Sequence, residues 1–245
     1  MNILLTNDDG FNSEGIKILK TLLSKYGKVV ICAPKGAMSA KSCSITIGTN
    51  LTLTKEDEDV YSVNGTPADC VSLALCDLPF DFDLVVSGCN NGLNVSYDAI
   101  YSGTIGACLE ALTYRKKTIA VSAPYNHVDL LTEETFNLFW NYINQNNLIS
   151  NEYLLNINLP RVTPLGVTLA KEYYRKDHNY FDKSVQGEFI PLRTLDDMND
   201  IPHDTDCYLV EHSYIAVVPL QKTYFSEDLY NKLKIWNIKY IFSTV

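Results

Sequence analysis

Residues 3–10 read ILLTNDDG. The first four are apolar or β-branched, a run typical of a strand that is buried on both faces of a sheet. The run ends in two adjacent acids, Asp8 and Asp9, followed by Gly10, a frequent turn residue. Ligands of open parallel sheets bind beyond the carboxyl ends of the strands, where strand order reverses. The stretch therefore predicts an α/β protein with two carboxylates at the ligand-binding edge.

Strand-like and helix-like segments alternate along the first two thirds of the chain. Further buried strands are expected at 29–33, 84–87 and 119–123. Helical spacing of apolar residues is found at 16–26, 67–76, 104–114 and 132–146. Such alternation is typical of βαβ units, so we expect a Rossmann-like three-layer fold with a mostly parallel sheet.

Two parts of the chain break this alternation. Residues 44–54 alternate apolar and polar side chains, and with 60–63 they predict an antiparallel β-hairpin excursion. Residues 208–219 read as a strand, followed by an apolar tail dotted with lysines. We expect one domain over residues 1–245, with the active site in a core of about 1–160 and a C-terminal lobe or oligomerisation arm over 161–245.

Composition excludes several classes of protein. The formal net charge of -9 and pI near 4.9 argue against binding of a nucleic-acid polymer. No uncharged apolar stretch approaches the roughly 18 residues of a membrane helix, and the first residues do not resemble a signal peptide. The seven cysteines include no CxxC pair and read as small core residues of a reducing compartment. The expected location is the cytoplasm.

The adjacent acids allow two interpretations. Two close carboxylates repel each other unless a cation neutralises them, and oxygen ligands suit Mg²⁺ or Mn²⁺. Asp8, Asp9 and Gly10 are equally typical of a plain turn. The residues of this stretch alone leave both interpretations open.

Three later loops are rich in small and polar residues and follow expected strands or precede a helix. They are APKGAMSA at 33–40, VSGCNNGLN at 86–94 and YSGTIGA at 101–107. Asparagine can coordinate a hard metal, and a helix N-terminus with small residues is a ready phosphate site. Each loop also has a structural interpretation as a turn or, at Ser102, as an N-cap.

One further segment and the histidines favour structural roles. In residues 64–69, Thr66 fits an N-cap, Pro67 the first helical position and Asp69 the third, close to a capping box. We therefore leave Asp69 out of the metal set. The four histidines show no zinc-ligand spacing and lie outside these loops.

Taken together, the loops resemble the SurE family of metal-dependent 5′/3′-nucleotidases. The matching segments are ILLTNDDG at 3–10, AP with Ser39 at 33–39, NGTPADCV at 64–71, VSGCNNGLN at 86–94 and YSGT at 101–104, with fainter matches at 157–160 and 206–220. The resemblance implies a phosphomonoesterase that hydrolyses nucleoside 5′- and 3′-monophosphates through metal-activated water. It also implies a homodimer or homotetramer.

The resemblance assigns roles residue by residue. It implies one divalent ion per subunit, Mg²⁺ or Mn²⁺, held by Asp8, Asp9, Ser39 and Asn90. Asp8 and Asp9 are also the expected catalytic residues. Around the phosphate it places Asn94, Ser102, Gly103 and Thr104.

The chain departs from the family pattern at two places, which leaves substrate preference open. Residues 35–40 lack the family's arginine before the ligand serine and its glycine after it, and 12–14 replace its His-Ala-Pro. Alternatives are a non-catalytic nucleotide-binding module and a short-chain polyphosphate phosphatase. A receiver domain lacks support because the strand at 84–87 ends without an aspartate, and a covalent aspartyl phosphatase would need acids two residues apart.

Overall fold

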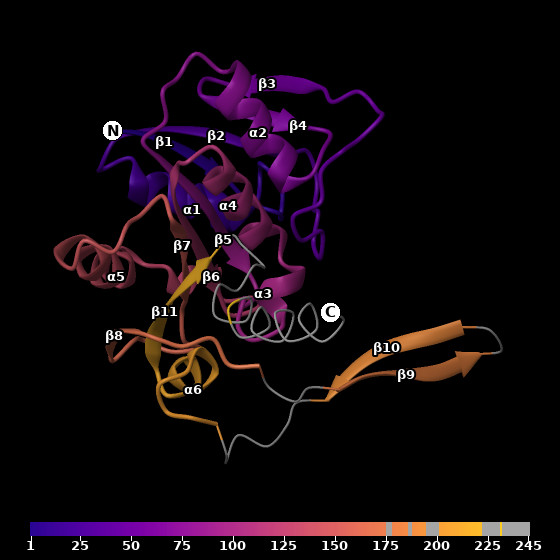
Figure 1. Cartoon of the computed structure of the whole chain (residues 1–245), viewed down its shortest axis with the longest axis vertical. Coiled ribbons are helices and arrows are strands. Elements are labelled where there is room, and N and C mark those ends of the chain that lie inside the picture. Colours follow the sequence, from indigo (N-terminus) through magenta and orange to yellow (C-terminus); the bar gives the residue numbers. More distant parts are fainter. Residues whose placement is uncertain (175–177, 186–187, 195–200, 222–230, 232–245) are drawn as a thin grey trace, which may run out of the picture.

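The computed structural model describes residues 1–174, 178–185, 188–194, 201–221 and 231. A nine-stranded sheet has the order β3-β4-β2-β1-β5-β6-β7-β11-β8, and β9 and β10 form a separate hairpin (Figure 1). The strands are β1 (Asn2–Thr6), β2 (Lys28–Pro34), β3 (Leu53–Asp57), β4 (Val60–Val63), β5 (Leu84–Asn91), β6 (Lys117–Ala123), β7 (Tyr153–Asn158), β8 (Gly166–Leu169), β9 (His178–Val185), β10 (Glu188–Thr194) and β11 (Tyr214–Gln221). The helices are α1 (Glu14–Leu23), α2 (Pro67–Asp77), α3 (Asp98–Tyr101), α4 (Gly103–Thr113), η1 (Val128–Leu130), α5 (Glu133–Gln145) and α6 (Asp206–Glu211).

The sheet is mostly parallel, as predicted. From β4 through β2, β1, β5 and β6 to β7, every neighbouring pair runs parallel. The exceptions lie near the two ends, where β3 is antiparallel to β4 and β11 is antiparallel to β7. The β3–β4 pair is a β-hairpin excursion of the expected kind.

Side chains of β1 alternate between two helical layers, which makes the fold three-layered. Ile3 and Leu5 belong to the hydrophobic core that contains buried residues of α1 and α5. Leu4 points to the opposite face and packs with residues of α2 and α4. All three side chains are fully buried, as expected for a strand covered on both faces.

Strand order reverses around β1. The chain passes from β1 through α1 to β2 on one side, whereas β5 pairs with β1 on the other. Thr6, the last residue of β1, lies opposite Ser87 of β5. The segments that leave β1 and β5 therefore diverge from one point at the carboxyl edge, where open α/β sheets bind ligands.

Two local predictions are wrong. Residues 44–52 form no strand, because Asp69 accepts hydrogen bonds from the backbone and hydroxyl of Thr46 (2.9 and 2.6 Å) and fixes this stretch as a loop. Residues 208–219 are not one strand: α6 covers the first part, and β11 begins only at Tyr214. Buried Leu209 and Val210 fit one face of a short helix as well as they fit a strand.

The predicted C-terminal lobe or arm over 161–245 is described only in part. Of the residues after Gln221, only 231 is described, so the arm and the oligomer stay predictions. Within the described part of the chain, no helix has the length and apolar character required to cross a membrane.

Candidate active site at the carboxyl edge of the sheet

The Asp8–Asp9 segment is a tight turn organised by the side chain of Asn7. The Asn7 amide donates to the Gly10 carbonyl (3.1 Å) and to Ser13 Oγ (2.7 Å), while its oxygen accepts the Gly10 N–H (3.0 Å). Gly10 has φ 104°, a backbone conformation that favours glycine. The segment is therefore a turn, and the hydrogen bonds of Asn7 that organise it do not involve the carboxylate of Asp8 or Asp9.

Asp8 is buried at the N-terminus of α4. Its Oδ1 accepts a hydrogen bond of 2.6 Å from the Thr104 hydroxyl. Burial raises the pKa of Asp8 to about 6, and the neighbouring Asp9 charge adds to the rise, while the Thr104 hydrogen bonds oppose it. The surroundings of Asp8 therefore disfavour its ionised form, and a nearby cation would favour that form.

Asp9 is half-buried and faces the end of β5. Its Oδ2 accepts the backbone N–H of Asn91 (3.1 Å), which joins the two strand ends. Burial raises the pKa of Asp9, and the Asn91 hydrogen bond opposes the rise. Among the described residues, neither Asp8 nor Asp9 forms an ion pair with lysine, arginine or histidine.

The first turn of α4 lies directly against Asp8. A Cβ added at Gly103 would approach Asp8 Cβ to 2.9 Å and Asp8 Oδ2 to 3.1 Å. Ser102 caps the helix, since its hydroxyl oxygen accepts the Ile105 N–H (3.1 Å). Among the residues that the structure describes, its hydroxyl hydrogen has no acceptor and is available for donation. The N-terminus of α4 therefore lies against the acidic turn through Ser102, Gly103 and Thr104. A helix N-terminus favours anions.

The loop that carries Ser39 is held at both ends. On one side the Met38 N–H donates to the Asp8 carbonyl (2.7 Å). On the other, Ser42 donates from its N–H to the Tyr101 carbonyl (2.9 Å) and from its hydroxyl to the Ile100 carbonyl (2.8 Å). Ser39 is exposed between these anchors, so the structure places it beside the acidic turn and the start of α4.

Asn90 and Asn94, both predicted ligands, differ in their surroundings. Asn90 lies in β5 opposite Ser122 of β6, and its amide donates to the Gly92 carbonyl (2.7 Å), which leaves its oxygen as a potential metal donor. The side chain of Asn94 is buried and donates to Ser122 Oγ (2.8 Å). The Asn94 amide is therefore part of a buried hydrogen-bond network, and its role in phosphate binding stays a prediction.

Two residues of that network, Asn156 and Asn158, were not predicted as site residues. Asn158 Oδ1 accepts the Asn94 N–H (2.8 Å), and both amides donate to the Asn94 carbonyl (2.8 Å from Asn156, 3.3 Å from Asn158). Their spacing of two residues indicates one face of a buried strand, but it does not indicate that they bind Asn94.

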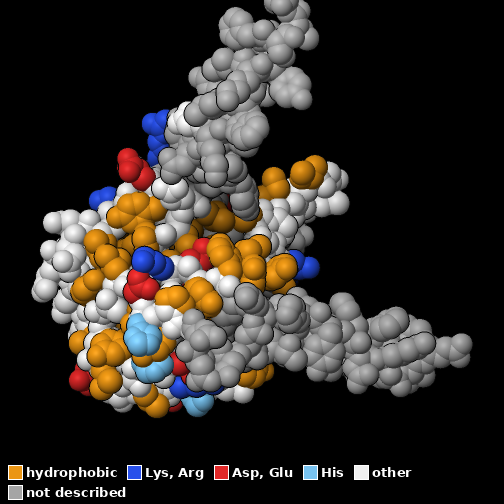
Figure 2. Space-filling view, turned by 60° about the horizontal axis from the view of Figure 1, so that its bottom comes forward, with side chains coloured by type: hydrophobic (Ala, Val, Ile, Leu, Met, Phe, Trp, Pro, Cys, Tyr) orange, Lys and Arg blue, Asp and Glu red, His pale blue; other side chains and the backbone are white. Residues whose placement is uncertain are grey.

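Asp69 does not belong to the site, as expected. Thr66 accepts the Asp69 N–H (3.1 Å) and Asp69 accepts the Thr66 N–H (2.8 Å), which is the predicted capping box of α2. His203 and His212 stack on Tyr208 of α6, with ring centroids 4.2 and 3.7 Å from it. Figure 2 shows histidines, acids and bases scattered among hydrophobic side chains on the face it presents.

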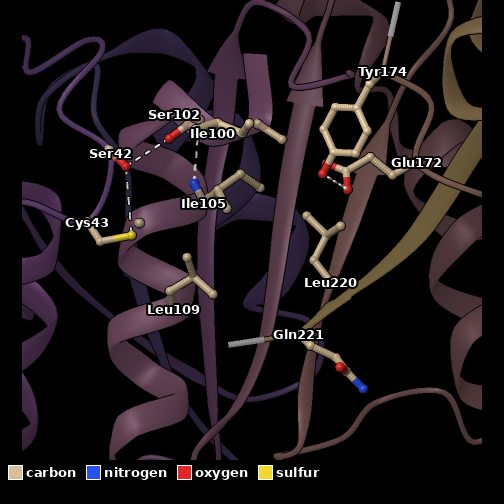
Figure 3. A pocket seen from close by; sticks show the side chains of 12 residues that line it. Ser42, Cys43, Ile100, Ser102, Ile105, Leu109, Glu172, Tyr174, Leu220 and Gln221 are labelled. Atoms are coloured by element: carbon tan, nitrogen blue, oxygen red, sulfur yellow. Dashed lines mark hydrogen bonds between the residues drawn. The ribbon is translucent and has the colours of Figure 1, made fainter. Parts of the chain in front are cut away.

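A cavity of about 430 Å³ flanks α4 but shares only Ser102 with the predicted site (Figure 3). Ile105 and Leu109 of α4 line one side, and Leu220 of β11 lines the other. At one wall the Tyr174 hydroxyl donates to Glu172 (2.6 Å), and this bond together with burial raises the pKa of Tyr174 to about 12. The cavity is mainly apolar, unlike the edge around Asp8.

The residues at the edge fit a divalent metal ion. Two adjacent carboxylates, whose pKa values burial raises, lie together without a basic partner among the described residues. Asn90 and Ser39 offer further oxygen donors nearby. An all-oxygen donor set suits Mg²⁺ or Mn²⁺ better than zinc.

The fold and the edge define the class of protein: a three-layer α/β protein with an acidic turn facing a helix N-terminus at the switch point of its sheet. The chain belongs to the SurE family, since the model of Survival protein SurE matches residues 3–179.

Individual relatives agree with this membership. A protein of Clostridium botulinum (strain ATCC 19397 / Type A) named 5′-nucleotidase SurE is 36% identical over 235 residues, covering 90% of this chain and 92% of its own. One of the same name from Natranaerobius thermophilus is 33% identical over 257 residues, covering 96% and 98%. The crystal structure of the SurE protein from Aquifex aeolicus superposes with a TM-score of 0.84 at 28% identity, covering 97% of this chain and 100% of that one.

Proposed function

We propose that this protein is a divalent-metal-dependent phosphomonoesterase that hydrolyses nucleoside 5′-monophosphates to nucleoside and phosphate. The observation that carries the proposal is the pair of adjacent carboxylates at the sheet edge, Asp8 against the N-terminus of α4 and Asp9 against the end of β5. Neither has a basic ion-pair partner among the described residues. A cation and a phosphoryl group are the two species that such an arrangement attracts. The names of the relatives, 5′-nucleotidase SurE, support this choice of substrate.

Asp8, Asp9, Ser39 and Asn90 would hold the ion, which when bound supplies Lewis acidity and lowers the pKa of a coordinated water. Thr104 orients Asp8 through its 2.6 Å hydrogen bond, and Asn91 orients Asp9 through its N–H. These two contacts fix the direction in which the carboxylates face.

The N-terminus of α4 would bind the phosphate group of the substrate. N–H groups of the first turn and the Ser102 hydroxyl hydrogen offer donors for the oxygens of the transferring phosphoryl group. Because these donors are fixed by helix geometry, they need no reorganisation as negative charge moves toward the leaving oxygen. Either Asp8 or Asp9 would accept the proton of the attacking water, the role expected of the two catalytic residues.

The test is a substrate panel on protein stripped of metal with a chelator and then supplied with Mn²⁺ or Mg²⁺. Nucleoside 5′-monophosphates, 3′-monophosphates and tripolyphosphate are compared by phosphate release. We expect the highest kcat/KM with a 5′-monophosphate and lower values with 3′-monophosphates. Nucleotide binding without phosphate release under any metal would contradict the proposal and select a non-catalytic binding module. Preference for tripolyphosphate would contradict the choice of substrate.

A further inference from the structure

The connection between β5 and α4 carries predicted phosphate-binding residues at both of its ends. Asn94 lies near its start, and Ser102 lies at its end, immediately after α3. Asp8, Asp9 and Ser39 are not part of this connection, and Asn90 precedes it within β5. A change in the position of the connection therefore displaces Ser102 most directly. Three predicted metal ligands, Asp8, Asp9 and Asn90, lie outside the connection, whereas the loop of Ser39 is joined to it through Ser42.

Ser96 is the point in this connection where the backbone turns into α3. It is fully buried and has φ 55°, an unusual conformation for a residue other than glycine. Its carbonyl accepts the Ala99 N–H (3.3 Å), and the Ala99 carbonyl accepts the Ser102 N–H (3.4 Å). Two backbone hydrogen bonds in series therefore connect Ser96 to Ser102, so we expect a change in the position of Ser96 to move Ser102.

The buried carboxylate of Asp206 holds Ser96 from the C-terminal part of the chain. Oδ2 accepts the Ser96 N–H (3.0 Å), while Oδ1 accepts the N–H groups of Tyr173 (3.2 Å) and Cys207 (2.8 Å). Only 1% of Asp206 is exposed, so water does not compete for these bonds. Asp206 is the first residue of the fainter family resemblance at 206–220, beyond residues 3–179, to which the family model was matched.

We propose that Asp206 is a positioning residue for phosphate binding, acting through Ser96 on the connection between Asn94 and Ser102. The proposal rests on the proposed phosphomonoesterase function. It assigns to α6 a role in activity although no residue of α6 is a predicted ligand of metal or phosphate.

The variant D206N tests the proposal selectively. The asparagine oxygen can keep the bonds from Tyr173 and Cys207, which both use Oδ1. The amide NH₂ then replaces Oδ2 and faces the Ser96 N–H, donor against donor. The change thus breaks the bond to the connection and preserves those within the C-terminal part. D204N is the matched control, because Asp204 is exposed and pairs only with Lys171 at the surface among the described residues.

Steady-state hydrolysis of a nucleoside 5′-monophosphate is measured for the wild type, D206N and D204N, with orthophosphate as inhibitor and Mn²⁺ varied. For D206N we expect KM and the inhibition constant of orthophosphate to rise about tenfold, in the range usual for partners that orient ligand-binding groups. The Mn²⁺ concentration for half-maximal activity changes less than KM does, because Asp8, Asp9 and Asn90 lie outside the connection. D204N behaves as the wild type.

Unchanged KM and phosphate inhibition in D206N, with an active wild type, would overturn the positioning role alone. An inert wild type would instead overturn the proposed function and the inference with it. Hydrogen exchange provides the check on folding: faster exchange confined to residues 93–101 supports the proposal. Faster exchange throughout β1 and α1 as well contradicts it, because the effect is then general destabilisation.

Discussion

At the scale of single residues, Asp8 is buried at a position that disfavours its ionised form. Its pKa is raised to about 6 in the folded protein, from the ordinary value of 3.8 for an aspartate side chain. Between these values the native state binds more protons than the unfolded chain, so Asp8 makes the metal-free protein less stable as pH rises through this window. The loss is complete above about pH 7, and a bound cation opposes it.

The variant D8N tests this directly in the presence of a chelator. Above pH 7 we expect D8N to exceed the wild type in free energy of unfolding by up to about 3 kcal/mol, from a shift of roughly two pKa units. Below pH 4 the difference disappears. Urea unfolding at several pH values measures it, and a difference independent of pH would contradict the assignment to Asp8 ionisation.

Gly103 is required by the contact of α4 with Asp8. An alanine Cβ would lie 2.9 Å from Asp8 Cβ and 3.2 Å from Pro67 Cγ, too close without a shift of the turn or of the helix start. We expect G103A to lower kcat/KM about tenfold or more by displacing Asp8. The control is G36A, where nothing lies within 4 Å of the added Cβ. Equal kinetics of G103A and the wild type would show that this contact is not needed.

At the scale of elements, the capping box of α2 joins the helix to the preceding loop. Thr66 accepts the Asp69 N–H and donates to the Ser44 carbonyl (2.6 Å), and Asp69 holds Thr46. We expect T66A to reduce the free energy of unfolding by about 1–2 kcal/mol, as for other lost N-caps. T21A, which removes an exposed hydroxyl bonded within α1, should cost less than about 0.5 kcal/mol. Equal losses in denaturant unfolding would contradict a special role for this cap.

Elements with a strong periodic pattern could be predicted from sequence, whereas those fixed by distant contacts could not. The buried strand β1 and the capped helix α2 carry their signals locally, in apolar residues and in Thr66 and Asp69. Residues 44–52 alternate as a strand does, but Asp69 holds Thr46 in a loop. The alternation of apolar and polar residues at 44–52 gives no information about this contact with Asp69, which decides between strand and loop.

The same distinction applies to the site. The position of Asp8 and Asp9 at the carboxyl edge could be predicted because they follow a buried strand, but their partners Thr104 and Asn91 lie more than eighty residues away in the chain. The inward hydrogen bond of Asn94 and the role of Asn158 depend on strand pairing between β6 and β7, which no local motif specifies.

At the scale of the whole molecule, a metal ion at the acidic turn stabilises the fold by mass action, because the unfolded chain has no formed site. At a metal concentration of 100 Kd the gain is about 2.7 kcal/mol, which for a chain of this size raises Tm by several degrees. We expect Mn²⁺ added to chelator-treated wild type to produce this rise in a thermal melt. In D9N the rise is largely lost, and an equal rise in D9N would place the ion elsewhere.

The most direct test of the central claim, that Asp8 and Asp9 hold the metal used in catalysis, is Mn²⁺-dependent release of phosphate from a nucleoside 5′-monophosphate by the wild type and D9N. We expect activity in the wild type that a chelator abolishes and Mn²⁺ restores, and a loss of at least about a hundredfold in D9N. Activity in D9N equal to that of the wild type, or wild-type activity that survives complete removal of metal, would contradict the claim.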